Sequence, residues 1–126
     1  MPALSLTLKP GRFAICRFPG GSPVPAWALG RRVFAVVARE GELSVLCPEE
    51  HVPARTRSEA GWRLLELAGP FPFEATGILA SVLGPLAAAG VGILALSTFD
   101  TDLVLVKEER LEEALAALRA AGHAVS

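Results

Sequence analysis

The chain has 126 residues, of which 52% are hydrophobic and 20% charged, and its formal net charge is -1. This length suits one ordinary domain or two very small ones, and the apolar content excludes a disordered chain. The balanced charge excludes an electrostatic surface for nucleic acid and a polybasic membrane contact. No secretory signal begins the sequence, and both cysteines have apolar neighbours, so we expect a cytoplasmic protein with buried thiols.

The first half of the chain predicts short strands joined by turns. A stretch after Pro25 suits at most one helical turn, at residues 25–29. Residues 55–60 are polar and predict an irregular segment. The runs of alternating or β-branched residues that predict strands are 4–8, as an extra edge strand, 13–18, 33–38 and 43–47.

Residues 75–99 carry no charge at all, which raises a membrane span as one alternative. Gly84-Pro85 interrupts this stretch near its middle, and no basic flank marks a cytoplasmic side. A helix bent at Pro85 is therefore the better interpretation. A set of small residues on one of its faces predicts close packing against a second element or subunit: Ala80, Ser81, Gly84, Ala87 and Ala88.

The second half predicts a regular alternation of strands and helices. In chain order it gives strand 62–67, helix 77–89, central strand 92–99, strand 102–107, helix 109–121 and strand 123–125. This is the βαββαβ order of a ferredoxin-like unit. The first half matches a degenerate copy with short or missing helices. We therefore predict an α+β chain of two tandem units, divided into residues 1–60 and 61–126.

A resemblance supports this order. The segment TGILASVLGPLAAAGVGILALSTFDTDLVLVKEE, with ELSVLCPEE ahead of it and PGRFAICR near the start, resembles small bacterial proteins made of two tandem ACT domains. It is also similar to the CASTOR-type cytosolic arginine sensors and, more distantly, to the regulatory ACT pair of aspartate kinases. The resemblance covers almost the whole chain. It implies a non-enzymatic regulatory protein that binds a small molecule, often an amino acid, at an interface between ACT units.

The resemblance also implies where the ligand binds: at the entrance of a helix and at a neighbouring strand turn. The residues carried over are Thr76, Gly77 and Ile78 at the helix, Thr98, Phe99 and Asp102 at the turn, and, less directly, Ser44 and Val45. Chemistry agrees independently, because a helix N-terminus offers N–H groups to a carboxylate and an aspartate binds an ammonium group. We further expect Thr76 to cap the helix and Asp100 to serve the turn.

One departure from the arginine sensors concerns the ligand. Those proteins have an acid just before the helix-entry glycine, whereas here Ala75 lies two residues before Gly77 and the acid, Glu74, lies one place further back. A smaller or uncharged amino acid, or no ligand, fits equally well.

Other chemistry finds little support. Residues 47–51 hold a cysteine, a histidine and two acids, but no second Cys/His pair follows at zinc spacing. We predict neither catalytic residues nor a metal or cofactor. Two hypotheses stay open: a regulatory module that binds an amino acid, and a structural or interaction module that dimerises without a ligand. The expected partners are a small molecule and a second copy or a regulated protein, with no nucleic acid or membrane.

Overall fold

The computed structural model describes residues 3–126, which form two compact units. Unit 2 is Gly11–Trp62, and unit 1 combines residues 3–10 with Arg63–Ser126. The sequence predicts that residues 1–60 form one unit, but residues 3–10 join the C-terminal half instead. The reason is that β1 (Ser5–Leu8) pairs with two strands of that half.

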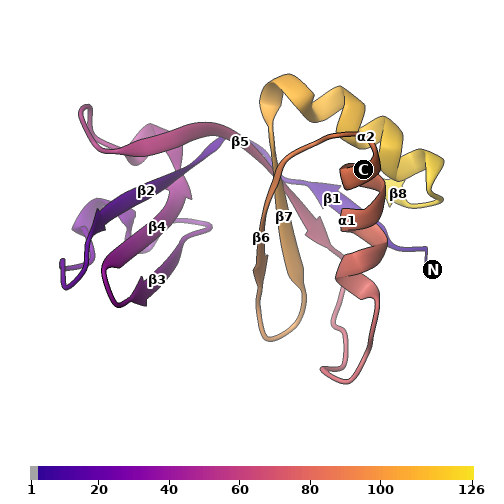
Figure 1. The fold of residues 1–126 in the computed structure, drawn as a ribbon, viewed down its shortest axis with the longest axis horizontal. Coiled ribbons are helices and arrows are strands. Elements are labelled where there is room, and N and C mark those ends of the chain that lie inside the picture. Colours follow the sequence, from indigo (N-terminus) through magenta and orange to yellow (C-terminus); the bar gives the residue numbers. More distant parts are fainter. Residues whose placement is uncertain (1–2) are drawn as a thin grey trace. The chain divides into compact units, whose positions relative to one another are not determined.

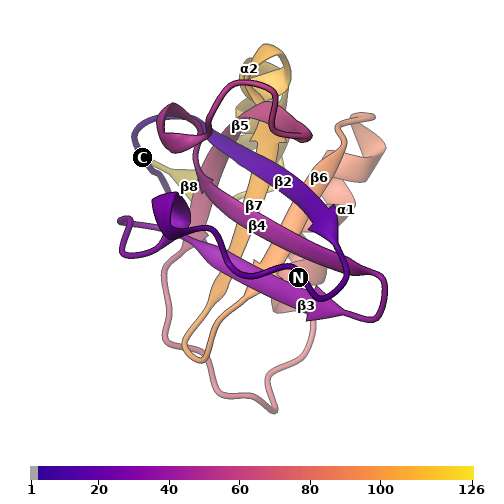
Figure 2. The same ribbon diagram turned by 90° about the vertical axis from the view of Figure 1, so that its left-hand side faces the viewer.

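Unit 2 is an antiparallel sheet with very little helix (Figure 2). Its strand order is β3-β4-β2-β5, where the first part of β5 belongs to this unit. The helical turn predicted at residues 25–29 is confirmed as a 3-10 turn, and a second 3-10 turn lies at Glu49–His51, where the sequence does not predict a helix. The elements are β2 (Phe13–Pro19), η1 (Ala26–Ala28), β3 (Ala35–Arg39), β4 (Glu42–Pro48), η2 (Glu49–His51) and β5 (Ser58–Leu67).

The polar segment 55–60 is only partly irregular. Strand β5 already begins at Ser58, because Ser58 and Glu59 pair with Cys16 and Ile15 of β2. Polar residues are tolerated there because all three residues from Ser58 to Ala60 are exposed. The expectation of an irregular segment is therefore wrong for its second half.

Unit 1 has the predicted βαββαβ order, which is confirmed from β5 to the C-terminus (Figure 1). Its sheet order is β6-β7-β5-β1-β8. Both helices pack on one sheet face, where leucines and valines of β1, β5 and β7 form a core with them. The further elements are α1 (Ile78–Ala88), β6 (Ile93–Ser97), β7 (Asp102–Lys107), η3 (Glu108–Arg110), α2 (Leu111–Ala120) and β8 (Ala124–Val125).

Two strand positions in unit 1 differ from the prediction. Strand β1 is not at an edge: Leu6 pairs with Leu67 of β5 on one side and with Val125 of β8 on the other. Strand β6 is not central, since among the described residues it pairs only with β7. Its exposed Ala95 and Ser97 are consistent with an edge, whereas Leu103 to Val106 of β7 are all buried.

Helix α1 spans 11 residues, with Pro85 inside it. Within residues 3–126, no helix has the length and apolar character that crossing a membrane requires. The small-residue face of α1 is only partly buried. Ser81 is buried, whereas Ala80, Gly84, Ala87 and Ala88 are exposed.

Candidate functional site

A cavity of about 330 Å³ lies in unit 1 between the β5–α1 loop and the β6–β7 turn. Five of the six unit 1 residues predicted for the site line it: Gly77, Ile78, Thr98, Phe99 and Asp102. Thr76 does not line it and is exposed. The structure thus brings together most of a site that the sequence spreads over more than twenty positions.

The helix entrance is built differently from the prediction. Gly77 is the N-cap residue of α1, with φ of 78°, and within the described part of the chain no side chain makes a capping hydrogen bond there. The expected cap at Thr76 is therefore wrong, because the chain enters the helix through a left-handed glycine that leaves no cap position for Thr76. The first hydrogen bond onto Gly77 comes from the N–H of Ser81, at 3.0 Å.

The N–H groups that precede Ser81 belong to residues 78–80, all of which line the cavity. Within residues 3–126 these three groups donate no hydrogen bond to other backbone or side-chain atoms. A helix N-terminus of this kind carries partial positive charge and binds carboxylates and other anions.

The β6–β7 turn is fixed to the end of β5. The Thr101 hydroxyl donates to the Leu67 carbonyl at 2.6 Å, and the Phe71 N–H donates to the Asp100 carbonyl at 2.9 Å. Thr98 and Thr101 bond each other through backbone and hydroxyl groups. Any Cβ at Gly69 would lie 2.7 Å from the Asp100 carbonyl oxygen, so this approach requires glycine. The Asp100 carbonyl thereby ties the turn to the β5–α1 loop, and the expected role of the Asp100 side chain in the turn stays a prediction.

Asp102 is half-buried at the start of β7 and accepts a hydrogen bond from the Ser97 hydroxyl, 2.5 Å from its Oδ1. Its second carboxylate oxygen makes no hydrogen bond within the described chain. Asp102 therefore offers one free anionic oxygen to the cavity that the three helix N–H groups also line.

Two phenylalanines lie at the cavity from opposite walls. Phe73 of the loop and Phe99 of the turn are 72% and 80% exposed, and their rings meet edge to face with centroids 5.0 Å apart. Such pairs stabilise by about 0.5 to 1.5 kcal/mol beyond area burial. The sequence does not predict Phe73 as a site residue. Its one local signal is its place after the Pro/Gly connection 68–72.

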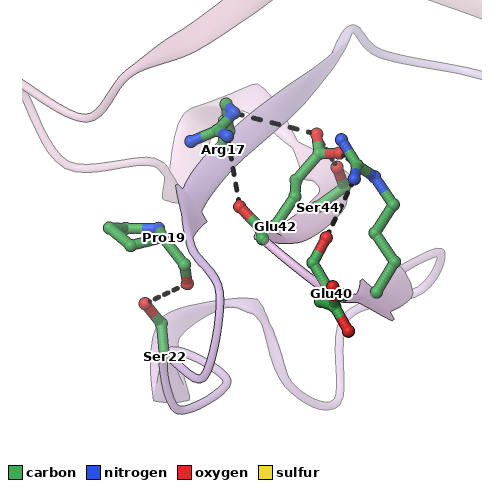
Figure 3. A network of polar contacts seen from close by, with 8 residues as sticks. Arg17, Pro19, Ser22, Glu40, Glu42 and Ser44 are labelled. Carbon is green, nitrogen blue, oxygen red and sulfur yellow. Dashed lines mark hydrogen bonds and ion pairs between the residues drawn. The ribbon is translucent and has the colours of Figure 1, made fainter.

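The two remaining predicted residues belong to unit 2. Val45 is fully buried in that unit's core, so it cannot contact a ligand. Ser44 instead joins a polar network, donating to Glu42 Oε2 at 2.9 Å beside Arg17 and Arg39 (Figure 3). The hydrogen bonds from Ser44 and Arg39 lower the pKa of the Glu42 carboxyl. Ser44 lines a separate cavity of about 270 Å³ in unit 2.

The cysteines have no reactive environment. Both are free and buried, and burial raises the pKa of the Cys16 thiol to about 11. Burial likewise raises the pKa of Cys47. In the part of the chain that the structure describes, no three His, Cys, Asp or Glu side chains are grouped so as to hold a metal ion.

Two protein-family models match the chain, one in each half. A model of the ACT domain matches residues 57–120, and a model of a different N-terminal domain matches residues 11–55. The cytosolic arginine sensor for mTORC1 subunit 1 is similar to the chain, with 28% identity over 129 residues in Bos taurus and 30% over 131 residues in Pongo abelii. Each match covers 94% of this chain but only 39% of the relative, so the chain spans about two fifths of these proteins' length.

Solved structures give similar results. A protein from Agrobacterium tumefaciens is 36% identical, with a TM-score of 0.94 over 100% of this chain and 94% of that chain. The ligand-free regulatory subunit of aspartate kinase from Thermus thermophilus has a TM-score of 0.64 over 92% of this chain and 96% of that one. Because its identity is 12%, the second likeness concerns the fold alone.

Proposed function

The chain belongs to the ACT domain family, and from this membership we propose that it is a non-enzymatic regulatory protein that binds an amino acid in the unit 1 cavity. Its relatives include a cytosolic arginine sensor. A likeness in fold extends to a regulatory subunit of aspartate kinase. The first protein is named as a sensor of an amino acid, which supports a regulatory role for this chain.

The pairing of a free helix N-terminus with a free aspartate oxygen carries this proposal. The N–H groups of residues 78–80 suit an α-carboxylate, and Asp102 suits an α-ammonium group. These are the two charged ends of an amino acid. The cavity of about 330 Å³ lies at the lower end of the range for small-molecule pockets, which fits a ligand of this size.

The further parts of the proposal concern assembly and location. We place the ligand at an interface between ACT units, with a second copy of the chain or a regulated protein as the partner. The exposure of Phe73 and Phe99 at the cavity supports a covering partner. Cytoplasmic residence is part of the same proposal, by analogy with the cytosolic sensor.

A thermal-shift screen against the twenty amino acids, followed by calorimetry, tests the proposal. A ligand at 100 times its dissociation constant should add about 2.7 kcal/mol to the free energy of unfolding. Asp102→Asn should weaken the binding at least about tenfold, because one charge-assisted hydrogen bond is lost. Glu112→Gln is the matched control, because it also replaces one carboxylate by an amide, at an exposed position of α2.

Two results would contradict parts of this account. If no amino acid stabilises the protein, the binding function is wrong. If an amino acid binds and Asp102→Asn leaves its affinity unchanged, the site is wrong while the function survives.

The second candidate is a module that dimerises without a ligand. The exposed, uncharged residues on α1 favour it, since Ala80, Gly84, Ala87 and Ala88 would let another helix approach closely. Light scattering on the purified chain, with and without amino acids, separates the two candidates. A dimer that is disrupted by Gly84→Leu and that ignores every amino acid would favour the structural module.

A further inference from the structure

The walls of the unit 1 cavity differ sharply in charge. The charged side chains that line it are Asp100 and Asp102, and both lie on the side of the β6–β7 turn. The β5–α1 loop and the first turn of α1 contribute apolar side chains, among them Phe71, Phe73, Ile78 and Leu79. Among residues 3–126, no lysine, arginine or histidine lines the cavity.

The loop wall is uncharged because Ala75, and not the neighbouring Glu74, lines the cavity. Glu74 is exposed instead. A ligand side chain that lies along this wall therefore meets no carboxylate. A cationic side chain would find no counter-ion there, and desolvating it would cost free energy.

The hydroxyl groups of the cavity are also occupied. Thr101 donates to the Leu67 carbonyl, Thr98 donates to the Thr101 carbonyl, and Ser97 donates to Asp102. Once Asp102 and the helix N–H groups hold the charged ends of a ligand, the one charged group left for its side chain is the Asp100 carboxylate on the turn wall, and the loop wall offers only apolar side chains. The exposed apolar surface at the cavity includes the aromatic pair of Phe73 and Phe99.

We propose, on the basis of the proposed function, that this cavity selects amino acids with a large, uncharged, apolar side chain, and that Phe73 and Phe99 determine that specificity. The two rings come from opposite walls and meet at 5.0 Å. A bound aliphatic or aromatic side chain covers these exposed rings and removes apolar surface of both molecules from water. An acidic side chain would instead be repelled by Asp100 and Asp102.

Calorimetry with four amino acids as probes tests the specificity: L-leucine, L-alanine, L-glutamate and L-arginine. These share the charged ends and differ in their side chains. We expect leucine to bind about tenfold more tightly than alanine. Glutamate should show no binding, and arginine should bind more weakly than leucine.

Variants then assign the effect to the two rings. Phe73→Ala and Phe99→Ala should each reduce the ratio of leucine to alanine affinity several-fold. Phe34→Ala, which removes a 40% exposed phenylalanine of unit 2, is the matched control and should leave the ratio intact. Because all three rings are exposed, the variants should fold.

The outcomes separate the two proposals. Binding of none of the four probes, nor of any amino acid in the full screen, refutes the proposed function. Alanine or glutamate binding as tightly as leucine, or arginine binding more tightly, refutes the specificity alone. The same holds if the leucine-to-alanine ratio survives both ring variants.

Discussion

His123 supplies the hydrogen bond that Pro85 denies to helix α1. In a regular helix the Ser81 carbonyl accepts from the N–H four residues later, but that residue is Pro85, which has none. The His123 Nε2 lies 2.8 Å from the Ser81 carbonyl oxygen, and its Nδ1 accepts from the Leu4 N–H at 3.0 Å. Since Nδ1 accepts, the neutral ring carries its hydrogen on Nε2 and donates to Ser81.

This bond makes a double-mutant prediction. His123→Ala should lower the free energy of unfolding by about 2 to 4 kcal/mol, because it leaves the buried Ser81 carbonyl and the partly buried Leu4 N–H without partners. Pro85→Ala in the same chain should recover part of that loss, since the new N–H reaches the Ser81 carbonyl. Urea unfolding of the four variants measures the coupling. His51→Ala should change stability by less than about 0.5 kcal/mol, and additive effects of the two changes would contradict the compensation.

Thr101 should hold the β6–β7 turn in place through its hydroxyl. Thr101→Val keeps the shape of the side chain but removes the 2.6 Å bond to the Leu67 carbonyl. We expect a loss of about 1 kcal/mol in the free energy of unfolding. Thr76→Val is the control, because Thr76 is exposed and should show a change close to zero. Equal effects of the two substitutions would mean that the hydroxyl does not fix the turn.

Two glycines of α1 should respond in opposite directions. Gly77→Ala places a side chain at φ of 78° and should destabilise the protein by about 1 to 2 kcal/mol, although no atom obstructs the new Cβ. Gly84→Ala lies inside the helix, with no atom of the described residues near the new Cβ apart from its chain neighbours, but a Cβ before Pro85 is disfavoured in the helical region, so the stabilisation should be smaller than the usual gain of about 0.5 to 1 kcal/mol. Chemical denaturation at several protein concentrations measures both. A loss of stability in Gly84→Ala would indicate that this face is covered in solution.

The thiols should be unreactive in the native protein and should make its stability depend on alkaline pH. Burial raises the pKa of Cys16 from its ordinary value of 9.0 to about 11, so the native state keeps its proton where the unfolded state loses it. The stabilisation is complete below pH 9 and decreases as the pH rises from 9 to about 11. Urea midpoints across this range should decrease, and Cys16→Ala should flatten that decrease.

Alkylation checks the same point chemically. Iodoacetamide at neutral pH should leave both cysteines of the folded protein unmodified and should modify both in guanidinium chloride. Rapid modification without denaturant would contradict their buried environment.

The sequence predicts local structure well because each element of unit 1 has its own periodicity or stop signal. Helix α1 ends close to Gly90, and β7 is buried on both faces, as its apolar run predicts. Pairing between distant strands is not encoded locally, so β1 was expected at an edge and β6 in the centre. The site was predictable as two segments. The structure differs from the predicted site at two points. Gly77, not Thr76, is the N-cap residue, which depends on the backbone conformation, and Val45 is buried, which depends on the face of the strand that its side chain occupies.

The position of β1 between β5 and β8 has a consequence for biosynthesis. Ser5 pairs with Ala124, so β1 leaves the ribosome long before β8, the strand that satisfies its second edge. Residues 11–62 have no such delay, and we expect them to fold while the rest of the chain is still being made. During this interval the strand from Ser5 to Leu8, which carries two leucines, has unpaired backbone groups that a chaperone would protect.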